Sequence, residues 1–394
     1  MKNVGTVVRG IRTGVIKEGD NLVDIVVTSL LNASKSDNFE FNDKDVVAIT
    51  EAVVGISEGN FATLDDIVCD IKTKLNSNHI GIVFPILSRN RFAVCLKGMA
   101  RSTKKITLLL SYPSDEVGND ILYKEDLEKY NVNPFTDTIT YEEYMSKFHN
   151  FIHPFTGVNM VDFYKELIES ENCEANIILS NRVEDILKYT KDVISCDIHT
   201  RQVTKEKLGR MGANVISMAD ILNKSVNGSG YNEEYGLLGS NRATEERVKL
   251  FPRTGQELVE TVQRRLKEET GKNIEVMVYG DGAFKDPVGK IWELADPVVS
   301  PAYTSGLVGS PNELKLKYLS ENKFKDLSGE ELNNAIKEEI KNKNTNLKGQ
   351  MVSQGTTPRR YTDLLGSLCD LTSGSGDKGT PVVLVQNYFS NYGD

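Results

Sequence analysis

A carboxylate-rich turn follows an apolar run near residue 280. Residues 273–279 (NIEVMVY) are predicted to form a buried strand, so Asp281 emerges at its carboxyl end, where α/β folds usually bind ligands. Gly280 and Gly282 flank this aspartate and allow the backbone to approach a ligand closely. Asp281 and Asp286 supply the hard oxygen ligands that Mg²⁺ or Mn²⁺ prefers. The pattern predicts a divalent-metal site, and the alternative is an Asp- and Gly-rich turn before an exposed helix.

Two adjacent arginines close the segment SQGTTPRR, residues 353–360. Arg359 and Arg360 can hold a phosphate or a carboxylate through paired hydrogen bonds. The alternative is a helix start, with Thr357 as the N-cap and Pro358 at the first helical position. The two interpretations are compatible, because a helix N-terminus itself attracts anions.

A glycine-rich segment, SGSGDKGTP, occupies residues 373–381 and contains Lys378. Its glycines match the dinucleotide pattern GxGxxG, but a strand is expected after it, whereas that fingerprint requires a helix. A hairpin loop and a loop that faces a nucleotide or a metal both remain open. We predict that Lys378 acts on phosphate together with Arg359 and Arg360.

The segment CDIHTR, residues 196–201, directly follows a predicted strand at 192–196. Asp197, His199 and Arg201 alternate, so they share one face if the segment is extended. Such a face predicts a site for an anionic substrate. The alternative is a structural histidine at a strand end.

The elements that must position these residues alternate between helix and strand, which predicts an α/β protein. Residues 1–120 read as the N-terminal part of a mixed core, and residues 271–394 as its C-terminal part. Residues 121–150 are an acidic surface segment, and residues 151–270 alternate short strands and helices, as in an inserted doubly wound parallel sheet.

Composition narrows the functional classes. The chain has 394 residues and a formal net charge of -9, which argues against non-specific binding to nucleic acid or to an anionic membrane. Its five cysteines are scattered and never spaced as CxxC, as expected for free thiols in a reducing compartment. With no apolar run long enough to span a membrane, the predicted location is the cytoplasm.

Both ends of the chain resemble a known family. The opening RGIRTGVIKEGDNLVDIV, the following DVVAITEAVVGISEGN and the closing TDLLGSLCDLTSGSGDKGTPVVLVQNY are similar to the deazaflavin coenzyme F-420 gamma-glutamyl ligase family. The motif YGDGAFKDPVGK lies where that family has a metal-binding loop. The resemblance covers about half of the chain and suggests a longer bacterial variant.

The resemblance implies a ligase that joins L-glutamate to a carboxylate on a small molecule, using GTP (or ATP) and two divalent cations, Mg or Mn. It also implies a homodimer and a metal role for Asp281. Carried over by position, the residues near the nucleotide are Arg12, Thr13, Gly14, Val15 and Asn60.

Some positions depart from the family pattern. A Ser-Lys pair of the nucleotide segment reads Gly55-Ile56 here, and a family metal loop reads LKGMARS, which puts Ala100 at its aspartate. Asp115 and Glu116, in SYPSDEVGN, are the candidates to replace that carboxylate.

The leading hypothesis is amide-bond formation through an acyl phosphate, with Asp197, His199 and Arg201 facing the acceptor. Its expected partners are a carboxylate substrate and an amino acid, without nucleic acid or membrane. One rival is a metal-dependent nucleotide or phosphate-ester hydrolase. The other is a metabolite-binding protein without catalytic activity, which the Ala100 departure favours slightly.

Overall fold

The computed structural model describes residues 4–89, 91–154, 156–280, 283–285, 292–294, 299–356, 359–373 and 376–393. The chain divides into two compact units. We call Met1–Val54, Thr254–Gly282 and Val298–Asp394 the core unit, and Gly55–Arg253 with Ala283–Pro297 the inserted unit. No helix among the described residues is both long and apolar enough to cross a membrane.

Strands from both ends of the chain form the sheet of the core unit. Its order is β1-β16-β2-β12-β15, with β2 and β12 parallel and the other neighbours antiparallel. The strands are β1 (Val7–Ile11), β16 (Val382–Gln386), β2 (Val46–Thr50), β12 (Glu275–Gly280) and β15 (Val299–Tyr303). Strands from both ends of the chain therefore lie side by side in one sheet.

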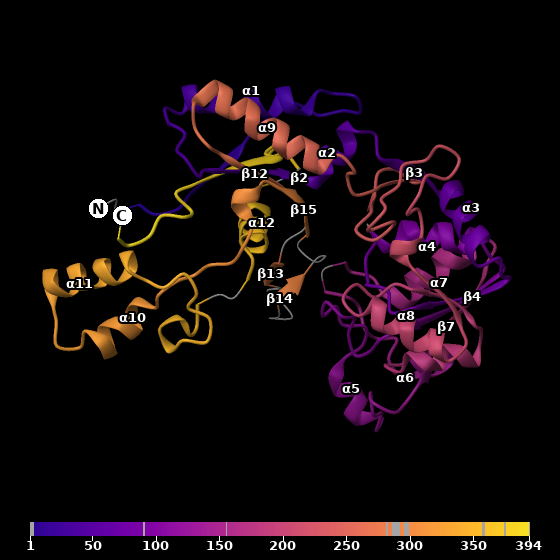
Figure 1. Ribbon diagram of the computed structural model, residues 1–394. Coiled ribbons are helices and arrows are strands. Elements are labelled where there is room, and N and C mark those ends of the chain that lie inside the picture. Colours follow the sequence, from indigo (N-terminus) through magenta and orange to yellow (C-terminus); the bar gives the residue numbers. More distant parts are fainter. Residues whose placement is uncertain are drawn as a thin grey trace. The chain divides into compact units, whose positions relative to one another are not determined.

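Helices cover both faces of this sheet (Figure 1). The apolar stripes of α1 (Leu22–Ser36) and α9 (Gly255–Thr270) pack on one face, and α12 (Tyr361–Thr372) packs on the other. Because β2 and β16 are buried on both faces, they are continuous apolar runs rather than alternating ones. Helix α9 ends at Gly271 in the left-handed conformation with a φ of 71°, as its C-terminal position favours.

An excursion of the chain between β15 and α12 carries short helices. These are η3 (Ser305–Leu307), α10 (Leu316–Tyr318), the π-helical turn η4 (Leu319–Lys323), α11 (Gly329–Lys341) and η5 (Met351–Ser353). Near the C-terminus, the Tyr392 hydroxyl donates to the Asn333 side chain on α11 at 2.9 Å. The excursion therefore packs against the end of the chain.

The inserted unit is a doubly wound sheet of order β6-β7-β5-β4-β8-β9. All neighbours are parallel except β6, which runs antiparallel to β7. The strands are β6 (Ile139–Thr140), β7 (Glu174–Leu179), β5 (Lys105–Leu110), β4 (His79–Val83), β8 (Asp192–Ser195) and β9 (Asn214–Ser217). The chain starts at β4 and builds outward in both directions, so the strand order reverses between β4 and β8. Such a switch point is where open α/β sheets bind ligands.

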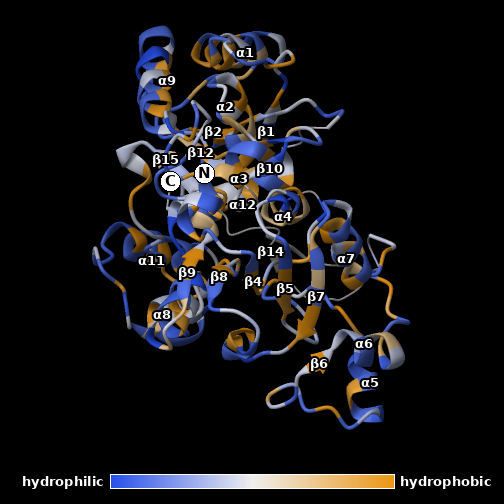
Figure 2. Ribbon diagram, turned by 90° about the vertical axis from the view of Figure 1, so that its right-hand side faces the viewer, coloured by the Kyte–Doolittle hydropathy of each residue, from blue (hydrophilic) through white to orange (hydrophobic). Residues whose placement is uncertain are grey.

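Two helical layers enclose this sheet. Helices α3 (Leu64–Lys74), α4 (Phe92–Arg101) and α7 (Met160–Ser170) cover one face, and η1 (Val183–Lys188) with α8 (Arg201–Arg210) covers the other. Figure 2 shows the carboxyl-terminal parts of β5 and β7 coloured hydrophobic, as expected for strand segments buried on both faces.

Small elements complete the fold. The remaining helices are α2 (Glu51–Ser57), α5 (Lys124–Lys129), α6 (Tyr141–Lys147) and η2 (Met218–Asp220), and the remaining strands are β3 (Phe61–Thr63), β10 (Asn241–Arg242), β11 (Arg247–Lys249), β13 (Ala283–Lys285) and β14 (Trp292–Leu294).

The predicted domain boundaries differ from the observed ones. The predicted insertion at 151–270 omits β4 and β5, which lie at the centre of the sheet that β7, β8 and β9 join. The inserted unit begins at Gly55 instead, and it includes the acidic segment 121–150, whose strand β6 pairs with β7. Residues 1–120 therefore belong to both units.

Candidate functional site

One edge of the core sheet collects several predicted site segments. Strands β1, β2 and β12 point the same way, so their carboxyl ends meet at this edge, which we call the carboxyl edge. The antiparallel strand β16 begins there, because Val382 pairs with both Ile11 and Ile49. The glycine-rich loop that enters β16 therefore lies at the same edge.

The predicted nucleotide loop 12–15 contacts that glycine-rich loop directly. The backbone N–H of Thr13 donates to the carbonyl of Gly379 at 3.3 Å. The two segments pack so closely that a Cβ on Gly10 would lie 3.1 Å from the Thr380 side chain. Arg12 and Lys378, one from each segment, are both exposed. The structure thus brings together two segments that are distant in the sequence, one predicted to contact the nucleotide and the other to contact phosphate through Lys378.

The remaining members of the nucleotide loop are open to solvent. Gly14 is exposed and a Cβ there would meet nothing, while 87% of the Val15 side chain is accessible. An apolar side chain so exposed is available to pack against a ligand. The role of these residues in nucleotide binding stays a prediction.

Two buried residues at the carboxyl edge were missed in the sequence. Glu51 begins α2 directly after β2 and is 4% exposed, and Tyr279 ends the buried part of β12 at 1% exposed. Burial raises the pKa of the Tyr279 phenol well above its usual value. Their position in the sequence was the available signal. Tyr279 ends the apolar run that was predicted as a strand, and Glu51 directly follows the apolar run VVAIT. Asp281 and Asp286 follow β12 in the sequence but lie outside the described residues.

The structure does not group Arg359 and Arg360 with Lys378. Arg360 is the N-cap residue of α12, and Lys378 comes after the end of that helix. A helix of twelve residues rises about 18 Å, so the arginines and the lysine flank different ends of it. The helix begins at Tyr361, where a final helix was predicted over residues 361–370, and later than Pro358, the first helical position of the alternative interpretation.

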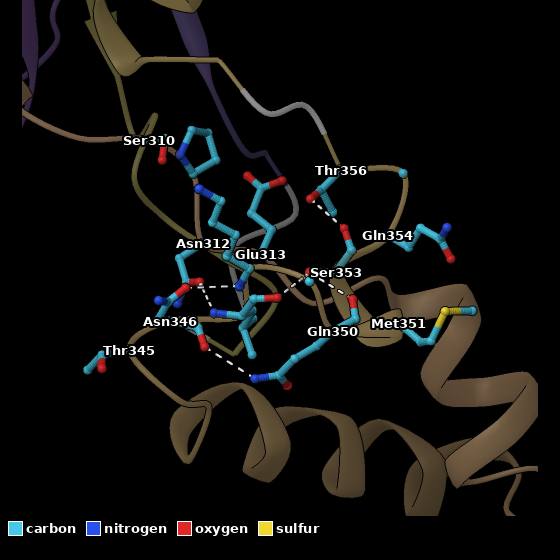
Figure 3. A pocket seen from close by; sticks show the side chains of 15 residues that line it. Ser310, Asn312, Glu313, Thr345, Asn346, Gln350, Met351, Ser353, Gln354 and Thr356 are labelled. Atoms are coloured by element: carbon cyan, nitrogen blue, oxygen red, sulfur yellow. Dashed lines mark hydrogen bonds between the residues drawn. The ribbon is translucent and has the colours of Figure 1, made fainter.

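Residues Ser353–Thr356 line a pocket of about 630 Å³ beside the start of α12 (Figure 3). Its other walls are residues 310–313 and 345–351 of the same excursion. The segment SQGTTPRR therefore leads from this pocket into the helix that covers the core sheet.

In the inserted unit, the segment CDIHTR follows β8 at the switch point. Asp197 is 1% exposed, and one of its carboxylate oxygens accepts from the hydroxyls of Thr200 at 2.6 Å and Thr204 at 2.8 Å. His199 is exposed, so it does not share a face with Asp197. The expectation of an extended segment is wrong, because these hydroxyl contacts bend the chain into α8, which starts at Arg201.

Asp115, on the loop after β5, holds that loop in shape. Its two oxygens accept four hydrogen bonds, from the backbone N–H groups of Leu87, Val117 and Asn119 and from the Asn119 amide. Burial raises the pKa of this carboxyl, and the four N–H donors partly oppose that effect. These contacts give Asp115 a structural role, while a role as a metal ligand stays a prediction. Its neighbour Glu116 accepts the backbone N–H groups of Ile198 and His199, which joins two loops across the switch point.

The cavity at the switch point is small in this conformation. It measures about 20 Å³, room for roughly one water molecule, and Arg91, Cys196 and Ile198 are among its lining residues. Sequence reasoning missed Arg91, although the basic segment SRNR after a predicted strand signalled it.

Two sequence-based assignments do not fit the structure. Asn60 is completely buried, and its side chain donates to the carbonyls of Tyr231 and Phe251 and accepts the N–H of Tyr231. It therefore joins three segments of the inserted unit instead of touching a nucleotide. Ala100 lies inside the buried helix α4, so LKGMARS is not a metal loop and the departure at Ala100 carries no functional meaning.

Comparison with known proteins decides the family. A family model described as F420-0:Gamma-glutamyl ligase matches residues 10–387. The chain belongs to this family. The match spans both units, so the relationship extends well beyond the two ends where the motifs are found. A search of curated proteins finds no significant match.

Membership in the gamma-glutamyl ligase family supports a ligase that adds glutamate. It implies small-molecule substrates such as glutamate and F420 derivatives. Among the described residues, no three His, Cys, Asp or Glu side chains gather closely enough to hold a metal ion. The predicted donors Asp281 and Asp286 are outside that set.

Proposed function

We propose that this ligase phosphorylates a substrate carboxylate with GTP or ATP and then joins the acyl group to the amine of L-glutamate. One observation carries the proposal on the structural side: the Thr13–Gly379 hydrogen bond places the nucleotide loop beside the glycine-rich loop at the carboxyl edge. Arg12 and Lys378 bring two exposed positive charges to these segments. Family membership supports the glutamyl transfer.

The proposed chemistry has two steps. A carboxylate oxygen of the acceptor attacks the γ-phosphorus, the bond to the bridging oxygen breaks, and the nucleoside diphosphate leaves. The uncharged amine of glutamate then attacks the acyl carbon, orthophosphate leaves, and the amine loses a proton to solvent. Negative charge accumulates on the phosphoryl oxygens in the first step, so the cations of Arg12 and Lys378 would lower its barrier.

A divalent cation would neutralise phosphate charge during this transfer. The residues proposed to hold it are Asp281 and Asp286, which lie outside the described residues. At the carboxyl edge, the described residues include one buried carboxylate, Glu51, and no group of three possible metal ligands. The two steps described above therefore draw only on groups of the described residues, Arg12 and Lys378 among them.

The test is a coupled assay with purified protein, the deazaflavin acceptor F420-0, labelled glutamate and either GTP or ATP with Mn²⁺ or Mg²⁺. We expect glutamate incorporation and orthophosphate release in equal amounts, both requiring the acceptor. Lys378→Met should lower kcat/KM by about ten- to a hundredfold, as for loss of one charge-stabilising group, whereas Arg360→Met should change it little.

Orthophosphate release in the absence of the acceptor would instead support the rival hypothesis, a metal-dependent nucleotide or phosphate-ester hydrolase. Glutamate incorporation without any nucleotide would reject the proposal. The homodimer and the cytoplasmic location stay predictions alongside it.

A further inference from the structure

The pocket beside the start of α12 is held open by hydrogen bonds between its walls. The Asn312 side chain accepts the backbone N–H of Leu347 at 3.0 Å and donates to the carbonyl of Asn344 at 2.9 Å. The Ser353 hydroxyl donates to the carbonyl of Leu347 at 2.7 Å. Figure 3 shows Asn312, Asn346 and Ser353 gathered at the base of the pocket. Its walls are therefore fixed relative to one another without any ligand.

Two lysines place positive charge at the wall of this pocket. Lys348 is part of the lining, and the ammonium of Lys315 would lie 3.2 Å from a Cβ on Gly355, another lining residue. The backbone N–H of Lys315 also donates to the carbonyl of Val352 at 2.7 Å, which anchors this lysine at the pocket wall.

The two arginines before α12 extend the positive charge. The backbone N–H of Tyr361 donates to the carbonyl of Gly309 at 3.0 Å, so the start of the helix lies against the chain that leads into the wall at Ser310. Arg359 and Arg360 directly precede Tyr361 and are both exposed. Among the described residues that line the pocket, Glu313 is the one carboxylate.

These cations have no ion-pair partner among the described residues. Neither ion pairs nor side-chain hydrogen bonds are formed there by Lys315, Lys348, Arg359 or Arg360. By contrast, three lysines on the helices of the same excursion are paired: Lys317 with Glu321, Lys323 with Glu339 and Lys341 with Glu338. The pocket and the start of α12 therefore carry unpaired positive charge, in a chain whose net charge is -9.

We infer that this pocket is a binding site for a small polyanion, a metabolite carrying two or more carboxylate or phosphate groups. Two lysines at the pocket wall and two exposed arginines directly before α12 outnumber the single carboxylate among the described lining residues, so a ligand with at least two negative charges would bring the site near neutrality. A volume of about 630 Å³ is in the range of metabolite pockets and is far larger than one oxyanion needs. The inference does not depend on the proposed reaction, because α12 separates this pocket from the carboxyl edge by about 18 Å of helix.

The test is calorimetric titration of the full chain with two probes, γ-glutamylglutamate for carboxylates and inorganic tripolyphosphate for phosphates. We expect at least one probe to bind with a Kd below about 1 mM, and the probe that binds identifies the oxyanion. The double variant Lys315→Met with Lys348→Met should weaken binding by about tenfold, since each exposed charge contributes a modest share. Glu313→Gln should strengthen it.

The matched control is Lys317→Met with Lys341→Met, which removes two paired lysines from the same excursion and should leave the affinity unchanged. Lys378→Met tests whether the probe binds at the carboxyl edge instead. The inference is overturned if neither probe binds to the wild-type chain, if the pocket variant keeps wild-type affinity while circular dichroism shows it folded, or if Lys378→Met causes the loss.

Discussion

At the residue scale, the two carboxylates Asp45 and Asp185 show how burial and hydrogen bonding compete. Both are almost completely buried, at 1% and 3% exposed, yet their pKa values shift in opposite directions. Asp45 has one oxygen that accepts from Asn42 and Gln386, and its other oxygen has no partner among the described residues. Asp185 has more donors, and two of them are the cations Lys188 and Arg182. This difference decides the direction of the pKa shift and gives two opposite expectations for stability.

Asp45→Asn should stabilise the protein at neutral pH. Burial raises the pKa of the Asp45 carboxyl, and its hydrogen bonds from Asn42 and Gln386 only partly oppose this. The stability tied to this group is therefore complete below the unfolded pKa of about 3.9 and is lost as pH rises through the folded pKa. Urea unfolding at pH 7 should show a higher midpoint for the variant, and the advantage should shrink towards pH 4. A variant less stable than the wild type at pH 7 contradicts this account.

Asp185→Asn should have the opposite effect. Burial alone would raise the pKa of this carboxyl, but donors from Lys188, Ser180, Thr138 and Arg182 outweigh it and lower the pKa well below its usual value. Its contribution is present above the unfolded pKa and is lost as pH falls through the folded pKa. We expect a loss of about 1–3 kcal/mol at pH 7, measured by urea unfolding. Equal stabilities of variant and wild type at pH 7 would show that these contacts contribute nothing.

At the scale of elements, the buried strands were predictable and their partners were not. The apolar runs predicted strands at 192–196 and 273–279, and the structure has them at β8 and β12 with small shifts at the ends. Strand order depends on contacts between residues far apart in the sequence, which no local pattern contains. For that reason β4 and β5 were assigned to the wrong unit.

The candidate site was predictable to a similar degree. The nucleotide and glycine-rich loops were each found in the sequence, but their contact at Thr13 and Gly379 follows from the pairing of β1 with β16. Asn60 was assigned by position to a nucleotide, whereas its fully buried amide holds backbone groups. Whether a polar side chain is exposed depends on tertiary packing, so sequence position alone misplaced it.

Gly81 tests how tightly the helical layer of the inserted unit packs on its sheet. A Cβ at this position on β4 would lie 2.6 Å from the Ile186 side chain on η1, closer than real contacts permit. We expect Gly81→Ala to destabilise the protein by about 1–3 kcal/mol in urea unfolding, because the core must shift to make room. Gly209→Ala on α8 is the matched control, since a Cβ there meets nothing and alanine favours a helix. If Gly81→Ala leaves the free energy of unfolding unchanged, η1 can move away from the sheet without loss of stability.

At the scale of the whole molecule, the family relationship spans both units, while the predicted phosphate-contacting segments lie in the core unit. Exposed apolar side chains of the core unit include Val15, Val308 and Met351. Such surface is a candidate for burial in an interface between two copies of the chain.

We therefore expect a homodimer in solution. Light scattering coupled to size exclusion should give about twice the chain mass of 43.9 kDa at micromolar concentrations. Val308→Asp should shift the population towards monomer if this side chain lies in the interface. A single monomer mass across a concentration series rules the dimer out.

The central claim is that an acyl phosphate links nucleotide cleavage to amide formation, and isotope transfer tests it most directly. The acceptor is prepared with ¹⁸O in its reactive carboxylate and turned over with nucleotide and L-glutamate, and the released orthophosphate is analysed by mass spectrometry. If the carboxylate attacks the γ-phosphorus, one ¹⁸O atom moves into each orthophosphate as the amide forms, and this is the result we predict. Amide formation with orthophosphate free of ¹⁸O would contradict the account.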